Sequence, residues 1–287
     1  MQKRKILVLG ITGMLGNVAF RYFAAHSNFE VRGTIRCLEH PSYLPAQNLD
    51  KIIYGVNAEN TDNLLKIFSD FKPNIVINCI GWNGTGGSPE FSSRGIAVNS
   101  LLPHRLAAIS KEFFARLIHI SSDGVYSGKS GNYGENCALD ATDLYGKSKS
   151  LGELNYPHTI TLRTSVIGHS LDNKSGLVSW FLSSSGFVQG YKKAIFSGLP
   201  CIELVQAIDK HVFPNPHLFG VYNISSDPIS KYDLLCLIAR IYNKKIDIIS
   251  DDKYIINRSL NSNRFKTATG FSVKAWPELV QSMFNFR

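Results

Sequence analysis

The stretch Lys5-Ile6-Leu7-Val8-Leu9-Gly10-Ile11-Thr12-Gly13-Met14-Leu15-Gly16, near the N-terminus, predicts the fold of the chain. Its first half is a continuous apolar run, which is typical of a strand buried on both faces in a parallel sheet. Its second half is a glycine-rich turn, followed by a helical pattern over residues 17–25. A strand, a glycine turn and a helix in this order are the context that a dinucleotide-binding site requires, although an ordinary strand-to-helix turn has the same order.

The three glycines of this turn, Gly10, Gly13 and Gly16, have distinct expected uses. One makes the tight turn, another lets the backbone approach a pyrophosphate at the helix N-terminus, and the third lets the helix pack on the strand. The residues between the glycines would contact the same cofactor: Thr12, Met14 and Leu15.

The end of the second predicted strand, residues 29–35, indicates which dinucleotide is bound. NAD-preferring proteins carry an acidic residue near this point, but here the strand leads into Arg36. A guanidinium can pair with a 2′-phosphate through its planar fork. We therefore expect NADP(H), with NAD(H) as the alternative, unless Arg36 is only a solvated side chain on the strand rim.

Strand-like and helical segments alternate along the rest of the chain. We predict further strands at residues 49–56, 75–81, 115–120, 159–166, 221–224 and 246–249, and helices at 61–71, 96–112, 145–154, 202–212 and 231–242. A short helix and a turn are expected around residues 180–187. This pattern predicts an α/β fold, a doubly wound parallel sheet (Rossmann) with a smaller, discontinuous C-terminal substrate lobe. The expected division is residues 1–168 plus about 196–224 for the NADP-binding domain and about 169–195 plus 225–287 for the substrate-binding lobe.

A second decisive stretch is Tyr145-Gly146-Lys147-Ser148-Lys149. On a helix, Tyr145 and Lys149 share a face. A cation within about 4–6 Å favours the phenolate and lowers the tyrosine pKa, so the pair could supply a proton donor or acceptor near neutral pH. The alternative is an ordinary pair of surface side chains on an amphipathic helix.

Other candidate residues follow the predicted strands, where ligands of a parallel sheet bind. Ser122 follows the fifth strand and could donate a hydrogen bond to a substrate oxygen. Asn57 lies where an adenine contact would fall, and Gly81 allows close backbone approach. The glycine-rich loop 82–89, beginning at Trp82, is a candidate substrate loop. Asn99 is either a buried hydrogen-bonding residue between helix and loop or a member of a proton relay.

Composition and charge narrow the classes of partner. The chain has 287 residues and a net charge of +9, and its basic residues are spread out. This distribution fits small anionic ligands better than a nucleic acid. The five cysteines form no Cys-x-x-Cys pair and are odd in number, which favours reduced thiols in the cytoplasm. We expect no signal sequence and no membrane span.

Together, Gly10/Gly13/Gly16, Ser122 and Tyr145-x-x-x-Lys149 resemble the extended short-chain dehydrogenase/reductase family. Within that family, four segments are similar to the dTDP-4-dehydrorhamnose reductase branch: residues 120–128 (ISSDGVYSG), 143–153 (DLYGKSKSLGE), 163–165 (RTS) and 258–262 (RSLNS). The resemblance covers nearly the whole chain.

The resemblance implies a role for each matching residue. Tyr145 would protonate the carbonyl oxygen of the substrate, Ser122 would hydrogen-bond that oxygen, and Lys149 would hold the nicotinamide ribose and lower the tyrosine pKa. Gly81 and Ser165 fall where the family lines the nicotinamide half of the cofactor. The residues implied to face the nucleotide-sugar are Trp82, Asp123, Arg258 and Asn261, with Arg258 on a phosphate.

The function implied is NADP-dependent reduction of a nucleotide-linked 4-keto-6-deoxy sugar for cell-surface polysaccharide biosynthesis. Three departures lie near the expected ligands: Asn57 replaces an Asp at the adenine, Gly124 replaces a Tyr, and residues 82–84 differ from the usual loop. The substrate is therefore dTDP-4-dehydrorhamnose or a related sugar nucleotide with another base or an acylamino group. The alternatives are a nucleotide-sugar epimerase and a non-catalytic NADP-binding regulatory subunit. No metal is expected, and a homodimer is compatible with the sequence.

Overall fold

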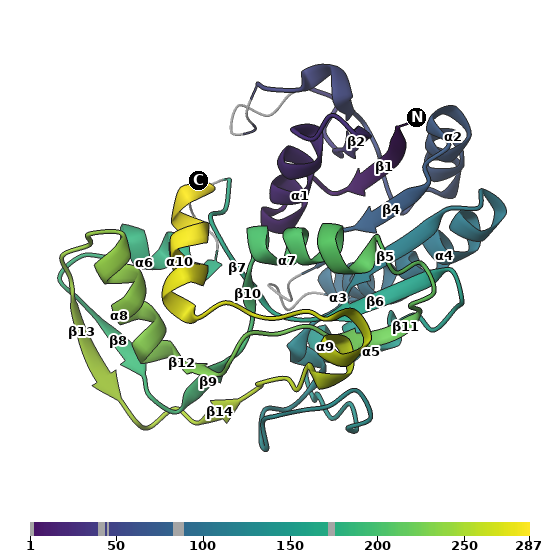
Figure 1. Cartoon of the computed structure of the whole chain (residues 1–287). Coiled ribbons are helices and arrows are strands. Elements are labelled where there is room, and N and C mark those ends of the chain that lie inside the picture. The colour runs from purple at the N-terminus through teal and green to yellow at the C-terminus, as the bar shows by residue number, and fades with distance from the viewer. Residues whose placement is uncertain (1–2, 40–43, 45, 83–88, 172–175) are drawn as a thin grey trace.

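A seven-stranded parallel sheet forms the centre of the molecule, as the computed structural model shows (Figure 1). The structure describes residues 3–39, 44, 46–82, 89–171 and 176–287. The strand order is β11-β6-β5-β4-β1-β2-β3. The strands are β1 (Arg4–Leu9), β2 (Phe29–Thr34), β3 (Ile52–Ile53), β4 (Ile75–Asn78), β5 (Arg116–Ile120), β6 (Thr159–Arg163) and β11 (Gly220–Asn223).

Strand β1 lies where the direction of the strand order reverses. It pairs in parallel with β2 on one side, where Ile6 is opposite Val31, and with β4 on the other, where Ile6 is opposite Ile75. The chain thus adds strands first in one direction and then in the other. Such a reversal opens a crevice at the carboxyl ends of the strands, where ligands of doubly wound sheets bind. The predicted fold class is confirmed.

Helices cover both faces of the sheet because side chains of β1 alternate between two hydrophobic clusters. Ile6 and Val8 point into the cluster that includes α1 (Met14–Ala24) and α7 (Cys201–Ala207). Leu7 and Leu9 point into the cluster formed with α2 (Thr61–Phe71) and α4 (Leu102–Glu112). All four side chains are fully buried. A strand buried on both faces therefore reads as a continuous apolar run.

Several predicted boundaries were wrong. The third strand, expected at residues 49–56, is a 3₁₀ turn, η1 (Leu49–Lys51), and the two-residue β3, because left-handed backbone at Asn48 (φ 62°) and Gly55 (φ 69°) confines the pairing. The helix expected from Asn17 begins at Met14. Helix α2 has the predicted bounds, and its N-cap is Asn60, whose side chain accepts hydrogen bonds from the amides of Asp62 and Asn63.

Other differences lie in the middle and second half of the chain. The helix expected over residues 96–112 is preceded by α3 (Pro89–Ile96) and starts with a π-helical segment, η2 (Ala97–Leu101). Helix α5 (Leu144–Leu151) ends before residue 154. The segment 201–212 divides into α7 and the π-helical η4 (Ile208–Val212). The turn expected near Phe187 is the start of β8 (Phe187–Tyr191).

Within the described residues, the other strands form three small sheets, and four further helices lie with them beside the large sheet (Figure 1). The sheets are β7–β10, β8–β13 and β9–β12–β14. Their strands are β7 (Val166–Ile167), β9 (Ala194–Phe196), β10 (Leu199–Pro200), β12 (Ile229–Ser230), β13 (Asp247–Asp251) and β14 (Ile256–Asn257), and the helices are α6 (Gly176–Ser183), α8 (Lys231–Ile241), α9 (Asn263–Thr269) and α10 (Trp276–Asn285). The hydrophobic core runs without a break from Ile6 to Leu234 and Met283. The division of the chain into an NADP-binding domain and a substrate-binding lobe, with boundaries at residues 168, 196 and 224, stays a proposal.

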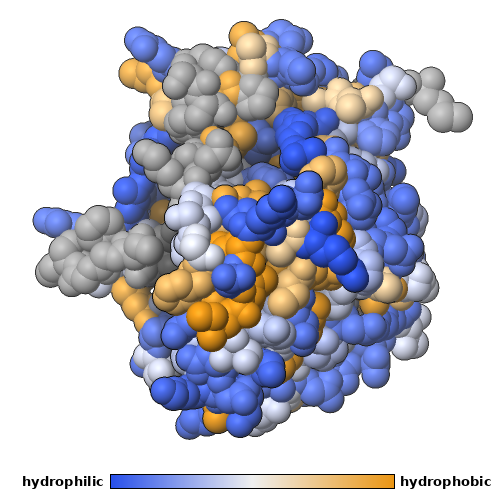
Figure 2. Space-filling model, turned by 90° about the vertical axis from the view of Figure 1, so that its left-hand side faces the viewer, coloured by the Kyte–Doolittle hydropathy of each residue, from blue (hydrophilic) through white to orange (hydrophobic). Residues whose placement is uncertain are grey.

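The surface of these elements carries apolar side chains. Figure 2 faces this side of the molecule and shows hydrophobic surface gathered in its centre, with hydrophilic residues around it. Exposed apolar side chains on α6, β8 and β13 include Trp180, Phe187 and Ile249. No helix of the described residues combines the length and apolar character needed to cross a membrane. All five cysteines lie within the described residues, and each is a free thiol.

Candidate active site

The glycine turn between β1 and α1 has the geometry that a bound pyrophosphate needs. Gly10 has φ +83°, and a Cβ there would lie 2.9 Å from Ile80 Cγ1. A Cβ on Gly16 would lie 2.2 Å from the Gly10 carbonyl oxygen, so only glycine lets α1 pack this closely. Gly13 precedes α1 as its N-cap and offers no side-chain cap. The first amide groups of α1 are therefore available to an anion, which the helix dipole also favours.

A cavity of about 690 Å³ lies over the carboxyl ends of β1, β4, β5 and β6. It brings together side chains that are far apart in the sequence. Its lining includes ten of the residues predicted from the sequence: Thr12, Gly13, Met14, Leu15, Gly81, Trp82, Ser122, Tyr145, Lys149 and Ser165. Several other lining residues, among them Cys79, Ser170 and Leu171, were not predicted, because apolar and small polar side chains on connecting segments carry no distinctive motif.

Tyr145 and Ser122 lie close together on the cavity lining. A Cβ built on Gly124 would lie 2.9 Å from Tyr145 Cε1 and 3.2 Å from Ser122 Oγ, so both groups surround this glycine. The Gly124 amide donates to Ser122 Oγ at 3.0 Å. Burial raises the pKa of Tyr145, and hydrogen bonding with Ser122 opposes this shift. The expected lowering of this pKa by Lys149 is therefore wrong for the chain by itself, because desolvation of the phenolate outweighs the nearby charges.

Lys149 is 6% exposed, and its Nζ donates to the Ile120 carbonyl oxygen at 2.9 Å. Burial lowers its pKa to about 8, while the negative charge of Glu153 acts in the opposite direction. An ammonium with this pKa is mostly charged at neutral pH. It is thus a hydrogen-bond donor on the cavity wall, as a ribose ligand would require.

Asn99 is fully buried, and it lies behind the cavity wall. Its Oδ1 accepts from the Trp82 amide at 2.8 Å, and its Nδ2 donates to the Trp82 carbonyl oxygen and to Ser148 Oγ, both at 3.0 Å. Its side chain therefore ties the segment after β4 to α5. Asn99 therefore supports the cavity wall through these hydrogen bonds and does not line the cavity itself. Residues 83–88 of the candidate substrate loop lie outside the described residues.

Arg36 and Asn57, both predicted to contact the cofactor, also lie outside the cavity lining. Arg36 is exposed just beyond β2. Asn57 is exposed as well, and its Oδ1 accepts from the Glu59 amide at 3.1 Å. Asn57 thus shapes the turn before α2, and its expected adenine contact stays a prediction, as does the contact of Arg36 with a 2′-phosphate.

Charged side chains from separate elements converge beside Tyr145. Burial raises the pKa of Asp123 to about 6, and the positive charges of Arg258 and Lys231 oppose the shift. Arg258 Nη2 lies 3.9 Å from Asp143 Oδ2, while its buried Nε has no partner among the described residues. Lys231, at the start of α8, was missed because only the folded chain brings it to Asp123. Burial lowers the Lys231 pKa.

Asn261 is the fourth residue expected at the substrate, but its side chain forms a hydrogen bond with a neighbouring backbone amide. Its Oδ1 accepts from the Asn263 amide at 3.0 Å, at the start of α9. Its own amide donates to the Tyr133 carbonyl oxygen at 2.8 Å. The structure therefore does not bring the side chain of Asn261 to the cavity lining.

Comparison with known proteins identifies the family. Residues 4–183 match the family described as "RmlD substrate binding domain". The chain belongs to this family. The resemblance to the extended short-chain dehydrogenase/reductases and to their dTDP-4-dehydrorhamnose reductase branch is thereby confirmed.

Two curated relatives of the RmlD-family chain carry different names. The chain is 30% identical over 152 residues to methionine adenosyltransferase 2 subunit beta of Danio rerio, a match that covers 52% of this chain and 42% of that protein. It is 25% identical over 240 residues to dTDP-4-dehydrorhamnose reductase of Aggregatibacter actinomycetemcomitans, covering 80% and 76% of the two chains.

A solved structure shares the RmlD-family fold. The dTDP-4-dehydrorhamnose reductase of Bacillus anthracis str. Ames, in complex with NADP, superposes with a TM-score of 0.81 at 17% identity and covers 99% of both chains.

Proposed function

We propose that the chain is an NADP-dependent reductase of a nucleotide-linked 4-keto-6-deoxy sugar. The observation that carries the proposal is the shared cavity, where Ser122, Tyr145 and Lys149 face the same space as the glycine turn. A turn with open helix amides, a buried ammonium and a phenol beside a hydroxyl fits a nicotinamide dinucleotide and a carbonyl substrate. The resemblance of the chain to dTDP-4-dehydrorhamnose reductases supports the same reaction.

The bound cofactor would supply the hydride, and the protein would supply the proton. Because burial raises the Tyr145 pKa, the phenol is neutral at physiological pH and can act as a general acid. The Gly124 amide donates to Ser122 Oγ at 3.0 Å, and the Ser122 hydroxyl donates to Asp123 Oδ1 at 3.3 Å. Rotation of this hydroxyl would turn its hydrogen from Asp123 to the carbonyl oxygen of the substrate. Tyr145 and Ser122 would then stabilise the negative charge that develops on this oxygen. Lys149 would hold the ribose.

The nucleotide-sugar would lie on the side of Tyr145 where Asp123, Arg258 and Lys231 converge. Arg258 and Lys231 face the carboxylates of Asp123 and Asp143, and they would supply the cationic donors that the phosphate oxygens of a diphosphate favour. Arg258 and Lys231 both come from the segment 225–287, which supports its assignment to the substrate-binding lobe. The substrate would be dTDP-4-dehydrorhamnose or a related sugar nucleotide with another base or an acylamino group, because Gly124 stands where that branch has a Tyr. The product would serve cell-surface polysaccharide biosynthesis, as the family resemblance implies.

A panel of 4-keto sugar nucleotides, scored by loss of NADPH absorbance, tests this function. We expect one member to be reduced with net NADPH consumption, which an epimerase that recycles its cofactor would not show. Tyr145→Phe should lower the rate by at least about a hundredfold, the scale of one general acid. Tyr156→Phe, a 41% exposed tyrosine, is the matched control and should keep full activity. An unchanged rate in Tyr145→Phe would refute the proposal.

A second candidate is a regulatory subunit that binds NADP without turnover. The match to a protein named as a subunit of methionine adenosyltransferase favours it. Such a protein needs no general acid, so the complete set of Ser122, Tyr145 and Lys149 favours the reductase. NADPH binding with no turnover across the panel, together with co-purification of a partner enzyme, would reverse this preference.

A further inference from the structure

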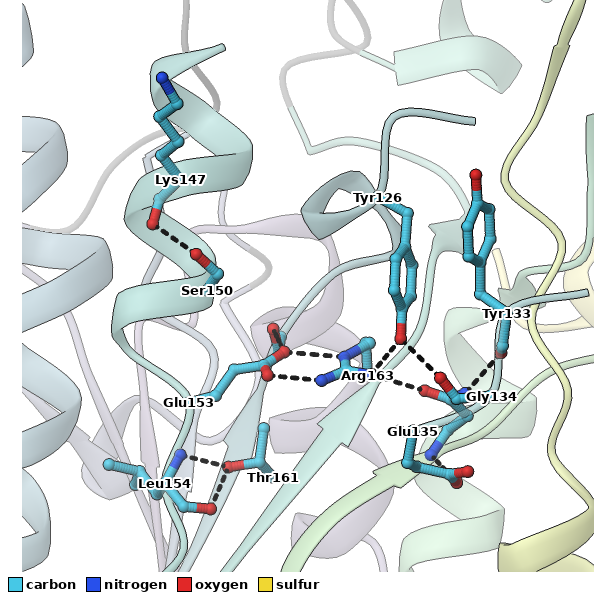
Figure 3. Close-up of polar contacts among 12 residues, drawn as sticks. Tyr126, Tyr133, Gly134, Glu135, Lys147, Ser150, Glu153, Leu154, Thr161 and Arg163 are labelled. Atoms are coloured by element: carbon cyan, nitrogen blue, oxygen red, sulfur yellow. Dashed lines mark hydrogen bonds and ion pairs between the residues drawn. The ribbon is translucent and has the colours of Figure 1, made fainter. Parts of the chain in front are cut away.

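Glu153 lies four residues beyond Lys149, just past the end of α5, and its side chain turns toward the sheet (Figure 3). The side chain is 7% exposed. Its Oε1 accepts from Ser121 Oγ at 2.7 Å and from Arg163 Nε at 2.9 Å, and its Oε2 accepts from Arg163 Nη2 at 2.6 Å. The carboxylate is therefore held by a two-point ion pair and a serine hydroxyl.

Arg163 completes a buried polar network on the other side of this pair. Arg163 lies at the end of β6, and its side chain is 3% exposed. Its Nη1 donates to the Tyr126 hydroxyl. That hydroxyl donates to the Gly134 carbonyl oxygen at 2.8 Å (Figure 3). The Arg163 guanidinium also lies 5.2 Å from the centroid of the Tyr126 ring. Because both charges have well-placed partners, the cost of burying them is offset.

The network is next to the catalytic groups along the chain. Ser121 directly precedes Ser122, and Arg163 directly precedes Thr164, whose carbonyl oxygen accepts from the Asp123 amide at 3.0 Å. Glu153 thus anchors the end of α5 to the ends of β5 and β6. The orientation of α5 sets where Tyr145 meets Ser122.

Lys149 and Glu153 are held by consecutive residues at the end of β5. Lys149 Nζ donates to the Ile120 carbonyl oxygen at 2.9 Å, and Glu153 Oε1 accepts from Ser121 Oγ at 2.7 Å, so the two charges lie near one another. The charged and titratable groups around the Lys149 ammonium come from three elements: Glu153 follows α5, Cys79 follows β4, and His119 lies on β5. Cys79 has a pKa raised to about 12 by burial, and His119 has a pKa held well below its usual value, so both are neutral near pH 7. Glu153 therefore carries the one full negative charge among these groups. A nearby carboxylate favours a protonated amine.

We propose that Glu153 is a positioning residue, which keeps Lys149 in its ammonium form and fixes the end of α5 against β5 and β6. Arg163 holds the Glu153 carboxylate in its orientation through hydrogen bonds from Nε and Nη2. The kinetic part of this inference rests on the proposed reductase function, whereas the effect on Lys149 does not.

The titration of Lys149 tests the inference directly. Protein labelled with ¹³C at lysine Cε is titrated by NMR, and Lys149→Arg identifies the signal that titrates near pH 8. In Glu153→Gln this titration should move down by about one pH unit, the scale of removing an opposite charge at close range. Glu203→Gln is the matched control, because Glu203 is a largely buried glutamate on α7 that pairs with Lys274 at 2.8 Å. It should leave the Lys149 titration unchanged.

A second variant addresses folding, because removing one partner of a buried ion pair costs about 3–5 kcal/mol. The double variant Glu153→Leu/Arg163→Met removes both charges and replaces them with apolar volume, which proteins tolerate. Its Lys149 titration should also move down. An unchanged Lys149 titration in this variant would overturn the inference, whether or not Glu153→Gln folds.

Kinetics then separates the two proposals. If the reductase function holds, the alkaline limb of the pH profile of kcat/KM should shift down together with the Lys149 titration. A shifted titration in a protein that turns over no keto sugar would refute the reductase function and leave the role of Glu153 standing. A shifted titration with an unmoved alkaline limb would overturn the kinetic part of the inference.

Discussion

Replacing Gly124 with alanine should impair the proposed reaction without preventing the chain from folding. The new Cβ would lie 2.9 Å from Tyr145 Cε1 and 3.2 Å from Tyr145 Cδ1 and Ser122 Oγ. Carbon atoms prefer separations of about 3.5 Å or more, so the Tyr145 ring must retreat by at least about 0.6 Å. The backbone of α5 leaves little room for this, because a Cβ on Gly146 would lie only 2.2 Å from the Gly124 carbonyl oxygen.

The size of the effect follows from this displacement. A misplacement near 1 Å at a reacting group can cost about a hundredfold in rate, so we expect Gly124→Ala to lower kcat by about ten- to a hundredfold. The KM should change little, because the phosphate-binding side of the cavity is not affected. Overpacking should also lower the free energy of unfolding by about 1–3 kcal/mol.

The assays are NADPH consumption with the best sugar of the panel and urea denaturation. Gly134→Ala is the matched control, since a Cβ there meets nothing within 4 Å. It should leave both quantities at wild-type values. If Gly124→Ala retained full kcat and full stability, the ring of Tyr145 would not lie against Gly124, and the geometric argument for the general acid would fail.

Two further predictions concern the cofactor and the pH dependence of folding. Arg36→Ala should raise the Kd for NADPH by about tenfold or more, the worth of one charge-assisted hydrogen bond, and leave the Kd for NADH nearly unchanged in fluorescence titrations; equal losses for both cofactors would contradict a 2′-phosphate contact. Because burial raises the Asp123 pKa from its usual 3.8 to about 6, the native protein binds more protons than the unfolded chain between these values, and the contribution of Asp123 to stability falls as the pH rises through this window. The unfolding free energy of Asp123→Asn, measured in urea from about pH 4 to pH 6, should therefore rise relative to the wild type, and a pH-independent difference would disprove the assignment.

The features that the sequence predicted well depend on local physics. The apolar run of β1, the glycines after it and helix α8 each express backbone or burial preferences of a few neighbouring residues. The third strand was wrong for a related reason. Its β-branched residues Ile52 and Ile53 favour a strand, but the length of pairing depends on where β2 ends and on the left-handed residues that flank β3.

In the candidate site, too, some features follow from the local sequence and others depend on distant segments. The sequence by itself determined the identity and order of the chemical groups, because the glycine turn, Ser122 and the Tyr145–Lys149 pair each occupy a fixed place relative to a strand or a helix. Only the tertiary structure decided the rest. It buried Tyr145 and thereby raised a pKa that the lysine was expected to lower, and it brought Lys231 beside Asp123 and enclosed Glu153 with Arg163. Desolvation and long-range ion pairing depend on which distant segments exclude water from a group, and no local pattern in the sequence contains this information.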